Sequence, residues 1–323
     1  MKKIFVHCFL NEKQKKILEK NFQVVIHNSN ENILTPKQLV KIASGFDGII
    51  CQGNLVDKEY IEKNKEILKA ISNVSVGYDN VDMKSAIKNK IAVFNTPNIL
   101  EDTVADFTMG MIIAVARKIC DGNNYVKSEK WQKNSWPLFL GEELNGEILG
   151  ILGMGNIGKK VAKRAKAFNL KIIYHNRNRL SIKEEKKYSA SYLDLKSLLQ
   201  HSKYLLILAP LNSATKYLMN KKTFLMMRKD SYLINIARGK IVKEKDLVEA
   251  LENKVIAGAA LDVFENEPKI NKKLMNLKNT VLMPHAGSAT LTTRNKMIEM
   301  ACKNISDFFI SNKKYNLVNK SYL

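Results

Sequence analysis

Three glycines near the middle of the chain constrain its fold more than any other feature. Gly153, Gly155 and Gly158 have the spacing GxGxxG in "GILGMGNIGKKVAKRAKAF", with an apolar run before them and an amphipathic helical pattern after them. In such a unit the first glycine permits a tight turn, the second lets the backbone approach a pyrophosphate, and the third lets the helix pack on the strand. The pattern therefore predicts a strand–turn–helix unit that binds a dinucleotide at the helix N-terminus.

The residues of this loop are the first candidates for cofactor binding. The N–H groups in the first turn of a helix have no intrahelical acceptor, so they are available to a phosphate. We expect contacts from Gly153, Gly155, Asn156, Ile157 and Gly158. The competing interpretation is a glycine-rich turn between strand and helix that binds no ligand.

The end of the next predicted strand, in "KIIYHNRNRL", indicates which dinucleotide is preferred. An acid normally stands about 20 residues after the glycines and binds the ribose hydroxyls. Here Asn176 takes that place and is followed by Arg177, Asn178 and Arg179. An asparagine does not repel a 2′-phosphate, and guanidinium groups bind one through charge-assisted hydrogen bonds. We expect NADP(H) to be preferred and NAD(H) to be possible; in the alternative, both arginines face solvent and the site accepts both cofactors or favours NAD.

Short apolar runs alternate with helical patterns along the whole chain, which indicates an α/β fold with parallel sheets. We predict two doubly wound domains. A flavodoxin-like domain with five strands spans 1–100 and is completed by a C-terminal helix over 291–323. A Rossmann dinucleotide-binding domain with six strands spans 101–290, and a single long helix over 100–119 opens it.

The formal net charge of +22 raises the question of a nucleic-acid partner. The lysines are spread along predicted helix faces, the chain has no arginine-rich block, and it has only two tryptophans. Nucleic acid is therefore an unlikely partner, kept only as a weak alternative. The charge would still attract anionic substrates and phosphorylated cofactors.

The cysteines and the hydropathy pattern exclude other classes of protein. The four cysteines are far apart and form no CxxC pair, so we expect neither a metal site nor a disulfide scaffold and place the protein in the reducing cytoplasm. The start, "MKKIFVHCFL", is predicted to be a strand and not a signal peptide. The longest apolar run, over 107–116, is too short to span a bilayer, so we expect no membrane attachment.

Polar residues at the ends of the later strands are the candidates for chemistry. His285 follows a buried strand in "VLMPHAGSAT", Arg238 follows another in "INIARGKIV", and Asp262 and Glu267 follow a third in "LDVFENEPKI". The carboxyl ends of parallel strands meet at one edge of a sheet, where α/β proteins place their active sites. The other four histidines lie in or beside predicted strands or a helix end, and we interpret them as structural.

The order GMGNIG, NIARG, ALDVFENEP, PHAGSAT resembles the D-isomer-specific 2-hydroxyacid dehydrogenase family. The segments "VSVGYDNVD" and "NTPNILEDTVADF" match as well, so the resemblance covers nearly the whole chain. Within the family, "WPLFLGEELNG" and "YHNRNRL" are most similar to the glyoxylate/hydroxypyruvate reductase branch. The resemblance implies NAD(P)H-dependent reduction of a small 2-oxo acid to the D-2-hydroxy acid, with 1–100 as the substrate domain.

The resemblance also assigns the catalytic roles. Arg238 would bind the 2-oxo acid and polarise its ketone, His285 would be the general acid, and Glu267 would stabilise the protonated imidazole. The chemistry asks for the same set, because hydride addition places negative charge on the carbonyl oxygen beside which a cation and a proton donor must lie. We expect reduction to weaken at alkaline pH, where His285 loses its proton.

The remaining site residues follow from the resemblance alone. Backbone N–H groups of Val76 and Gly77 would bind the substrate carboxylate, with Leu55 beside them in the substrate pocket. Asp262 would hold the nicotinamide carboxamide. Other predicted cofactor contacts are Ile236, Ala237, Ala286 and Gly287, and on the adenine side Pro210 and Thr215. The family often has histidine where this chain has Ala209, which weakens the assignment at the adenine end.

The aromatic loop before the glycines belongs, in this family, to a dimer contact, so we expect a homodimer. Trp136 would pack at that interface or reach the partner's active site; equally, it would only anchor its own loop.

Several alternatives stay open. D-lactate or D-3-phosphoglycerate dehydrogenase would keep the chemistry and change the substrate. A cofactor-sensing, corepressor-like interaction protein would keep the fold, and the set Arg238, Glu267 and His285 does not separate the two classes, because some corepressors retain it.

Overall fold

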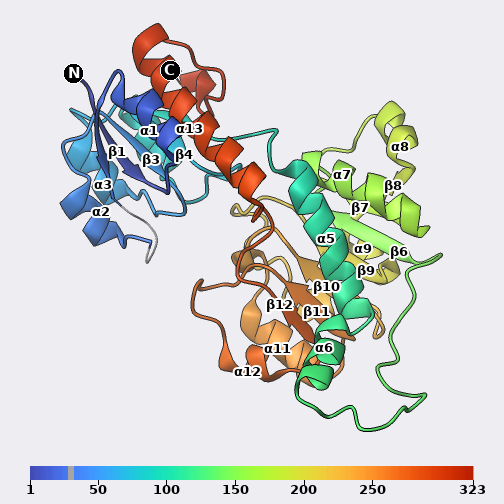
Figure 1. Ribbon diagram of the computed structural model, residues 1–323. Helices are drawn as coiled ribbons and strands as arrows, with labels where there is room; N and C mark the ends of the chain where they lie inside the picture. Colours follow the sequence, from blue (N-terminus) through green and yellow to red (C-terminus); the bar gives the residue numbers. More distant parts are fainter. Residues whose placement is uncertain (28–32, 323) are drawn as a thin grey trace. The chain divides into compact units, whose positions relative to one another are not determined.

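The computed structural model describes residues 1–27 and 33–322. The chain divides into two compact units, which we call unit 1 (residues 1–100 and 290–323) and unit 2 (residues 101–289). Each unit has its own parallel β-sheet and its own hydrophobic core (Figure 1). The prediction of an α/β fold with two parallel sheets is confirmed.

The sheet of unit 1 has five parallel strands in the order β2-β1-β3-β4-β5. This is the strand order of flavodoxin-like folds, and the five strands are the ones that the apolar runs predict. The central strands β3 and β4 are buried at every position, because helices cover both faces of a parallel sheet. The strands are β1 (Lys3–His7), β2 (Gln23–Ile26), β3 (Gly48–Cys51), β4 (Ala70–Asn73) and β5 (Ala92–Phe94).

The helices of unit 1 begin at side-chain caps that the sequence supplies. They are α1 (Glu12–Glu19), α2 (Pro36–Ile42), α3 (Lys58–Asn64) and α4 (Met83–Lys88), capped in turn by Asn11, Thr35, Asp57 and Asp82. Helices α2, α3 and α4 pack on one face of the sheet against Phe5, Ile49 and Ile71. Helix α13 (Leu291–Ser311) packs on the other face, with α1 beside it (Figure 1).

The predicted C-terminal helix over 291–323 is wrong after residue 311, and residue 323 lies outside the described residues. Helix α13 ends at Ser311, because Asn312 takes a left-handed conformation with φ 50°. The chain then runs antiparallel beside β5: the Asn95 N–H donates to the Asn316 carbonyl, and the Val318 N–H donates to the Val93 carbonyl. A short 3₁₀ turn (Lys320–Tyr322) follows. The tail thus covers an edge strand, which a helix in its place would have left open.

The sheet of unit 2 has seven parallel strands in the order β12-β11-β10-β9-β6-β7-β8. Numbered within the unit, six of them form the Rossmann order 3-2-1-4-5-6, and β12 adds a seventh at the edge. We predicted six strands; the missed one is β8, which has three residues of which only Ala190 is buried. The strands are β6 (Ile148–Leu152), β7 (Lys171–His175), β8 (Ala190–Tyr192), β9 (Tyr204–Ile207), β10 (Tyr232–Asn235), β11 (Gly258–Leu261) and β12 (Thr280–Leu282).

The helix predicted over 100–119 is interrupted. Helix α5 (Glu101–Ala116) stops before Lys118, whose φ of 52° is left-handed, and α6 (Ile119–Lys127) starts anew. Helix α5 packs against α7 (Asn156–Ala165), and Arg164 of α7 binds Asp106 and Asp102 of α5 at 2.6 and 3.0 Å. The other helices of unit 2 are α8 (Ile182–Tyr188), α9 (Leu195–His201), α10 (Lys221–Phe224), α11 (Glu244–Glu252) and α12 (Lys272–Asn276), with 3₁₀ turns at Lys166–Phe168 and Gly239–Ile241.

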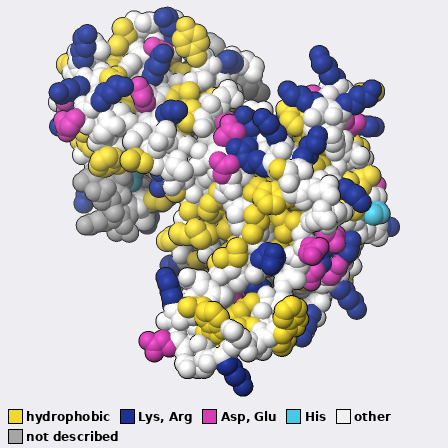
Figure 2. Space-filling model, turned by 45° about the vertical axis from the view of Figure 1, so that its right-hand side comes forward, with side chains coloured by type: hydrophobic (Ala, Val, Ile, Leu, Met, Phe, Trp, Pro, Cys, Tyr) yellow, Lys and Arg dark blue, Asp and Glu magenta, His cyan; other side chains and the backbone are white. Residues whose placement is uncertain are grey.

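The surface carries the large positive charge in a dispersed form. On the face shown in Figure 2, lysine and arginine side chains occur over both units and alternate with acidic side chains. Within the residues that the structure describes, none of the helices combines the length and the hydropathy needed to cross a bilayer.

Candidate active site

The predicted catalytic and cofactor residues of unit 2 lie at one edge of its sheet. They follow the carboxyl ends of β6, β7, β9, β10, β11 and β12, where parallel strands release their loops. The strand order reverses between β6 and β9, and ligands of open α/β sheets bind outside such a reversal. The topology therefore brings the dispersed sequence motifs to a common edge.

The glycine loop has the geometry that its sequence predicts. Gly153 has φ +101°, and a Cβ atom on it would lie 2.4 Å from the Ala209 nitrogen. A Cβ atom on Gly158 would lie 3.1 Å from the Gly153 carbonyl oxygen, where the helix meets the loop. A Cβ atom on Gly155 would meet nothing within 4 Å, and Gly155, the N-cap residue of α7, has no side chain to cap the helix. The N-terminus of α7, with Asn156 and Ile157 in its first turn, is thus open to an anion.

Asn176 is tied to the glycine loop. Its side-chain oxygen accepts the Met154 N–H at 2.6 Å, across the loop that joins β6 to α7. The amide thereby fixes the backbone of the loop beside the position where the cofactor's ribose would lie. The sequence alone gave no signal for this contact, because it joins residues at the ends of two neighbouring strands.

The two arginines after Asn176 are in different situations. Arg179 forms two hydrogen bonds of 2.8 Å with Glu185 of α8, and Tyr174 donates to the same carboxylate at 2.7 Å. The hydrogen bonds from Arg179 and Tyr174 lower the pKa of Glu185 to about 2, against the opposing effect of burial and with help from the arginine's charge. Arg177 and Asn178 are exposed, and Arg177 has no hydrogen bond or ion pair with any other residue in the described part of the chain.

The loop after β9 is a rigid turn. The Thr215 hydroxyl donates to the Pro210 carbonyl at 2.6 Å, and the Asn212 side chain accepts the N–H groups of Ala214 and Thr215. The predicted adenine-side residues Pro210 and Thr215 are therefore held together. Ala209, in the position where a histidine is frequent, packs its backbone against Gly153.

Asp262 organises the loop that carries His285. Its carboxylate, which is 1% exposed, accepts the Ala286 N–H at 2.6 Å and the Gly287 N–H at 2.9 Å. Burial raises the pKa of Asp262 and outweighs the effect of the two backbone hydrogen bonds. Ile236 and Ala237, after β10, are buried nearby, and a Cβ atom on Gly287 would lie 3.6 Å from Ile236.

His285 and Glu267 form a hydrogen-bonded pair. The distance from His285 Nδ1 to Glu267 Oε2 is 2.8 Å, and a carboxylate only accepts, so Nδ1 carries the proton and Nε2 is the ring atom left for exchange. The other oxygen of Glu267 accepts the Phe264 N–H at 2.9 Å. Burial acts to raise the pKa of Glu267, but the hydrogen bond and charge of His285, the Phe264 N–H and the charge of Arg238 hold it below its usual value.

Arg238 lies at the end of β10 with its backbone fixed. Its carbonyl accepts the Asn235 side-chain N–H at 3.0 Å, and its guanidinium donates to the Ala237 carbonyl at 2.8 Å. Gly239 after it lies directly against Phe264: a Cβ atom there would come within 1.9 Å of the Phe264 carbonyl. The segment with Arg238 and the segment with Glu267 therefore pack backbone to backbone.

This arrangement can transfer a proton beside a fixed positive charge. The carboxylate of Glu267 stabilises a protonated imidazole, and Arg238 adds a cation whose charge is felt at Glu267. Such a set stabilises an oxygen atom that gains negative charge and then takes up a proton.

The predicted substrate residues Leu55, Val76 and Gly77 belong to unit 1. Leu55 follows β3 with a side chain that is 48% exposed. Val76 and Gly77 follow β4 and are half-buried. Their N–H groups donate to no acceptor among residues 1–27 and 33–322.

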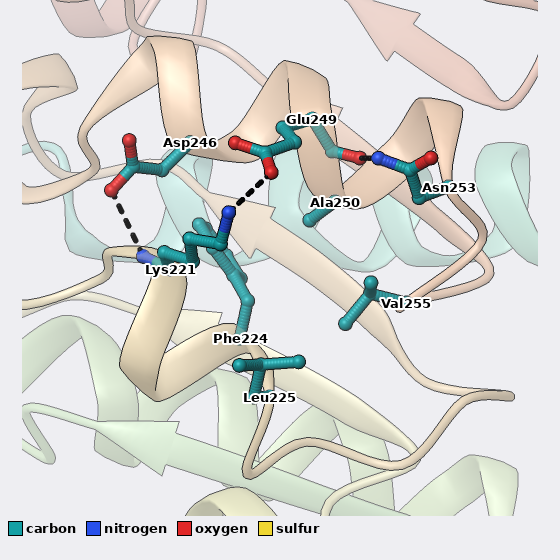
Figure 3. A pocket seen from close by; sticks show the side chains of 8 residues that line it. All are labelled: Lys221, Phe224, Leu225, Asp246, Glu249, Ala250, Asn253 and Val255. Carbon is teal, nitrogen blue, oxygen red and sulfur yellow. Dashed lines mark hydrogen bonds and ion pairs between the residues drawn. The ribbon is translucent and has the colours of Figure 1, made fainter.

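A small hollow elsewhere in unit 2 lies between α10 and α11 (Figure 3). Its cation, Lys221, is already bound to Glu249 at 2.5 Å, and the Lys221 N–H donates to Asp246. The hollow contains none of the predicted site residues, so we assign it no part in the chemistry.

A comparison with protein families identifies the chain. Residues 109–287 match the model of the D-isomer specific 2-hydroxyacid dehydrogenase, NAD binding domain. The chain belongs to this family. The matched residues lie within unit 2, which is therefore the NAD-binding domain.

Individual members of the family align over their whole length. Two proteins named glyoxylate reductase, from Pyrococcus furiosus and Thermococcus litoralis, are 37% and 39% identical to the chain; both alignments cover 99% of it, and 96% and 98% of the respective relatives. A crystal structure of an NADPH-dependent glyoxylate/hydroxypyruvate reductase from Sinorhizobium meliloti, in complex with NADP and malonate, has a TM-score of 0.88 at 28% identity and covers 100% of this chain and 98% of that chain.

Family membership settles the class of protein. The chain is an oxidoreductase, and its reaction is the reduction of a 2-oxo acid to a 2-hydroxy acid. The sequence-based predictions of the family and of an enzyme are confirmed.

Proposed function

We propose that the protein is an NADPH-dependent reductase that converts glyoxylate to glycolate and hydroxypyruvate to D-glycerate. The observation that carries the proposal is the 2.8 Å hydrogen bond between His285 and Glu267, at the sheet edge that also bears Arg238. The relatives named glyoxylate reductase support the choice of substrate.

The mechanism assigns one task to each of the three side chains. Arg238 binds the 2-oxo acid and draws electron density toward its ketone oxygen. Bound NADPH supplies a hydride for the ketone carbon. His285 gives the proton on Nε2 to the oxygen as its charge grows, and Glu267 stabilises the imidazolium before that transfer. In unit 1, the N–H groups of Val76 and Gly77 bind the carboxylate, and Leu55 limits the size of the side chain.

The cofactor fits the residues at the edge of unit 2. The open space at Gly155 and the uncapped N-terminus of α7 leave room and N–H donors for the pyrophosphate. Asp262 would hold the carboxamide; Ile236, Ala237, Ala286 and Gly287 would line the nicotinamide side, and Pro210 and Thr215 the adenine side.

The preference for NADP(H) over NAD(H) rests on the end of β7. Asn176 carries no charge that would repel a 2′-phosphate, and exposed Arg177 is able to bind one. Arg179, engaged with Glu185, contributes less because its Nε and one Nη already donate to a carboxylate.

The proposal extends to assembly and location. We propose a homodimer in the reducing cytoplasm, with unit 1 as the substrate domain. The exposure of Trp136, which is 95%, supports a place at the interface over an anchor of its own loop. Ile119, Val126, Trp131 and Leu140 of the same region are also exposed. Exposed apolar residues in such numbers are typical of an interface. The four cysteines are free.

The test is a substrate panel with the purified protein. Glyoxylate, hydroxypyruvate, pyruvate and phosphohydroxypyruvate are each assayed with NADPH and NADH. We expect the highest kcat/KM with glyoxylate or hydroxypyruvate and NADPH. A clear preference for pyruvate or phosphohydroxypyruvate would favour a D-lactate or D-3-phosphoglycerate dehydrogenase, and a preference for NADH would overturn the cofactor assignment.

A further inference from the structure

Three asparagines in unit 1 bind the loop that follows β4, and the proposed mechanism gives them no role. They are Asn73 at the end of β4, Asn80 in "VSVGYDNVD" and Asn95 in "NTPNIL". Asn73 is fully buried, and Asn80 and Asn95 are half-buried. The side-chain amides of Asn73 and Asn95 hold the segment from Ser75 to Gly77, and Asn80 binds the Asn73 side chain.

The carbonyl groups of this segment are bound by protein donors one after another. The Ser75 carbonyl accepts the Thr96 N–H at 2.9 Å. The Val76 carbonyl accepts the Asn95 side-chain N–H at 2.9 Å. The Gly77 carbonyl accepts the Asn73 side-chain N–H at 2.8 Å. Three successive peptide groups are thus fixed through their oxygens.

Fixing a carbonyl also fixes the N–H on the other side of the same peptide group. In a planar trans peptide, the N–H of the next residue points opposite to the C=O. The Thr96 contact therefore orients the Val76 N–H, and the Asn95 contact orients the Gly77 N–H, each away from its protein donor. These are two N–H groups that have no protein acceptor in the described residues.

Asn80 joins this loop to the loop that bears Leu55. Its side chain exchanges hydrogen bonds with the Asn73 side chain at 2.9 and 3.1 Å, and it donates to the Asn54 carbonyl at 2.8 Å. Its backbone carbonyl accepts the Val56 N–H at 2.8 Å. Asn80 therefore binds the loop on both sides of Leu55 as well as the side chain of Asn73.

We propose that Asn73, Asn80 and Asn95 are positioning residues that preorganise the site for the substrate carboxylate. Asn95 holds the Gly77 N–H in the direction that a carboxylate needs before it arrives. The Thr96 backbone N–H does the same for the Val76 N–H, Asn73 fixes the peptide group that follows, and Asn80 links the site to Leu55. A carboxylate bound by preoriented N–H groups gains charge-assisted hydrogen bonds without the cost of ordering a loop. The inference rests on the proposed function, because it takes a 2-oxo acid as the ligand of these N–H groups.

The test compares a substrate that has the carboxylate with one that lacks its charge. Asn95→Ala and Asn73→Ala are assayed with glyoxylate and with methyl glyoxylate. We expect kcat/KM for glyoxylate to fall about tenfold or more, mainly through KM, while that for the ester changes less than about twofold. The KM for NADPH should be unaltered. The ratio of the two kcat/KM values is independent of the folded fraction, so partial unfolding does not imitate the effect.

Asn64→Ala is the matched control. Asn64 is a buried asparagine of unit 1 whose side chain also binds backbone, donating to the Tyr60 carbonyl and accepting the Gly45 N–H, but at the end of α3. It should lower stability and leave the acid-to-ester ratio unchanged. An unchanged ratio in both Asn95→Ala and Asn73→Ala, or the same shift in Asn64→Ala, would overturn the inference.

Calorimetric binding of oxamate, an unreactive isostere of a 2-oxo acid, separates this inference from the proposed function. In the presence of NADPH, we expect oxamate to bind the unaltered protein and to bind Asn95→Ala about tenfold or more weakly. Equal affinities would count against the asparagines. In another outcome, the unaltered protein binds oxamate, Asn95→Ala binds it more weakly, and the unaltered protein reduces no 2-oxo acid. That outcome would refute the proposed function and support the inference.

Discussion

At the scale of single residues, the chemistry depends on which ring nitrogen of His285 carries the exchangeable proton. Glu267 binds Nδ1 at 2.8 Å, and the Phe264 N–H holds the carboxylate from the other side. The geometry fixes the tautomer before any substrate is present. His285→Ala should therefore lower kcat for 2-oxo acid reduction by about a hundredfold or more. Steady-state kinetics at saturating cofactor measure this, and an unchanged kcat would rule out His285 as the acid.

Glu267→Gln tests the pH dependence of the pair. The pKa of Glu267 is lowered in the folded protein. The ionised carboxylate therefore stabilises the fold at pH values above the ordinary glutamate pKa of about 4.3. This stabilisation is lost as the pH falls through the lowered pKa of the folded protein. The difference in thermal midpoint between the unaltered protein and Glu267→Gln should thus be present at pH 7 and shrink below about pH 4.3. A difference that is the same at both pH values would contradict this account.

The two arginines at the cofactor end provide another test at this scale. Arg177→Ala should raise KM for NADPH by about tenfold and change KM for NADH little, because only NADPH carries the 2′-phosphate. Arg179→Ala should have the smaller effect, since Arg179 already binds Glu185. Initial rates with both cofactors measure the difference, and the reverse ranking would show that the arginine leaves Glu185 for the phosphate.

Sequence reasoning reached some of these residues and missed others for a physical reason. Arg238, Glu267 and His285 stand in motifs that are contiguous in the sequence and follow strands, so their placement at one sheet edge was predictable. Glu185 is different, since its contact with Arg179 depends on how the turn between β7 and α8 folds back. Asn80 and Asn95 stand in matched motifs and Asn73 directly precedes one, but their hydrogen bonds join separate loops and leave no periodic signal.

At the scale of elements, the turn from β6 to α7 contains one glycine that the fold requires, Gly153, and one that leaves room for the cofactor, Gly155. Gly153→Ala should lower the free energy of unfolding by about 2 kcal/mol or more, because φ is positive and the new methyl group would collide with the Ala209 backbone. Gly155→Ala should change it by only about 0.5 kcal/mol, since the methyl group meets open space, yet raise KM for NADPH. Denaturant titration and cofactor kinetics of both variants check this contrast. Similar losses of stability in the two would contradict it.

The hydropathy of the sequence marks the elements that were predicted correctly. It does not mark the features that were missed. Strands buried on both faces, such as β9, appear in the sequence as unbroken apolar runs. Strand β8 has only one buried residue, so hydropathy does not mark it. The interruption between α5 and α6 depends on the left-handed conformation of Lys118, which neither glycine nor proline announces.

At the scale of the whole molecule, the proposed homodimer would use the exposed apolar residues between Ile119 and Leu140. Light scattering should give the mass of a dimer, that is, twice 36.7 kDa. Trp136→Asp should shift the protein toward the monomer, because it places a charge in the proposed interface. Tyr315→Asp, at another exposed aromatic residue that is 65% exposed, is the control and should leave the mass unaltered. A monomer in the unaltered protein, or a dimer insensitive to Trp136→Asp, would count against this interface.

The antiparallel pairing of Leu317 with Phe94 has a consequence for biosynthesis. Residues 1–100 leave the ribosome first, but the helix and tail that complete their sheet are synthesised after all of unit 2. Domains generally fold as they emerge, the N-terminal part first. In this chain the two units are completed in the reverse order. When all of unit 2 has been synthesised, the N-terminal sheet still lacks α13 on one face and the tail along β5. Because uncovered apolar faces and unpaired strand edges promote aggregation, unit 1 is the part of the chain that carries this risk during translation.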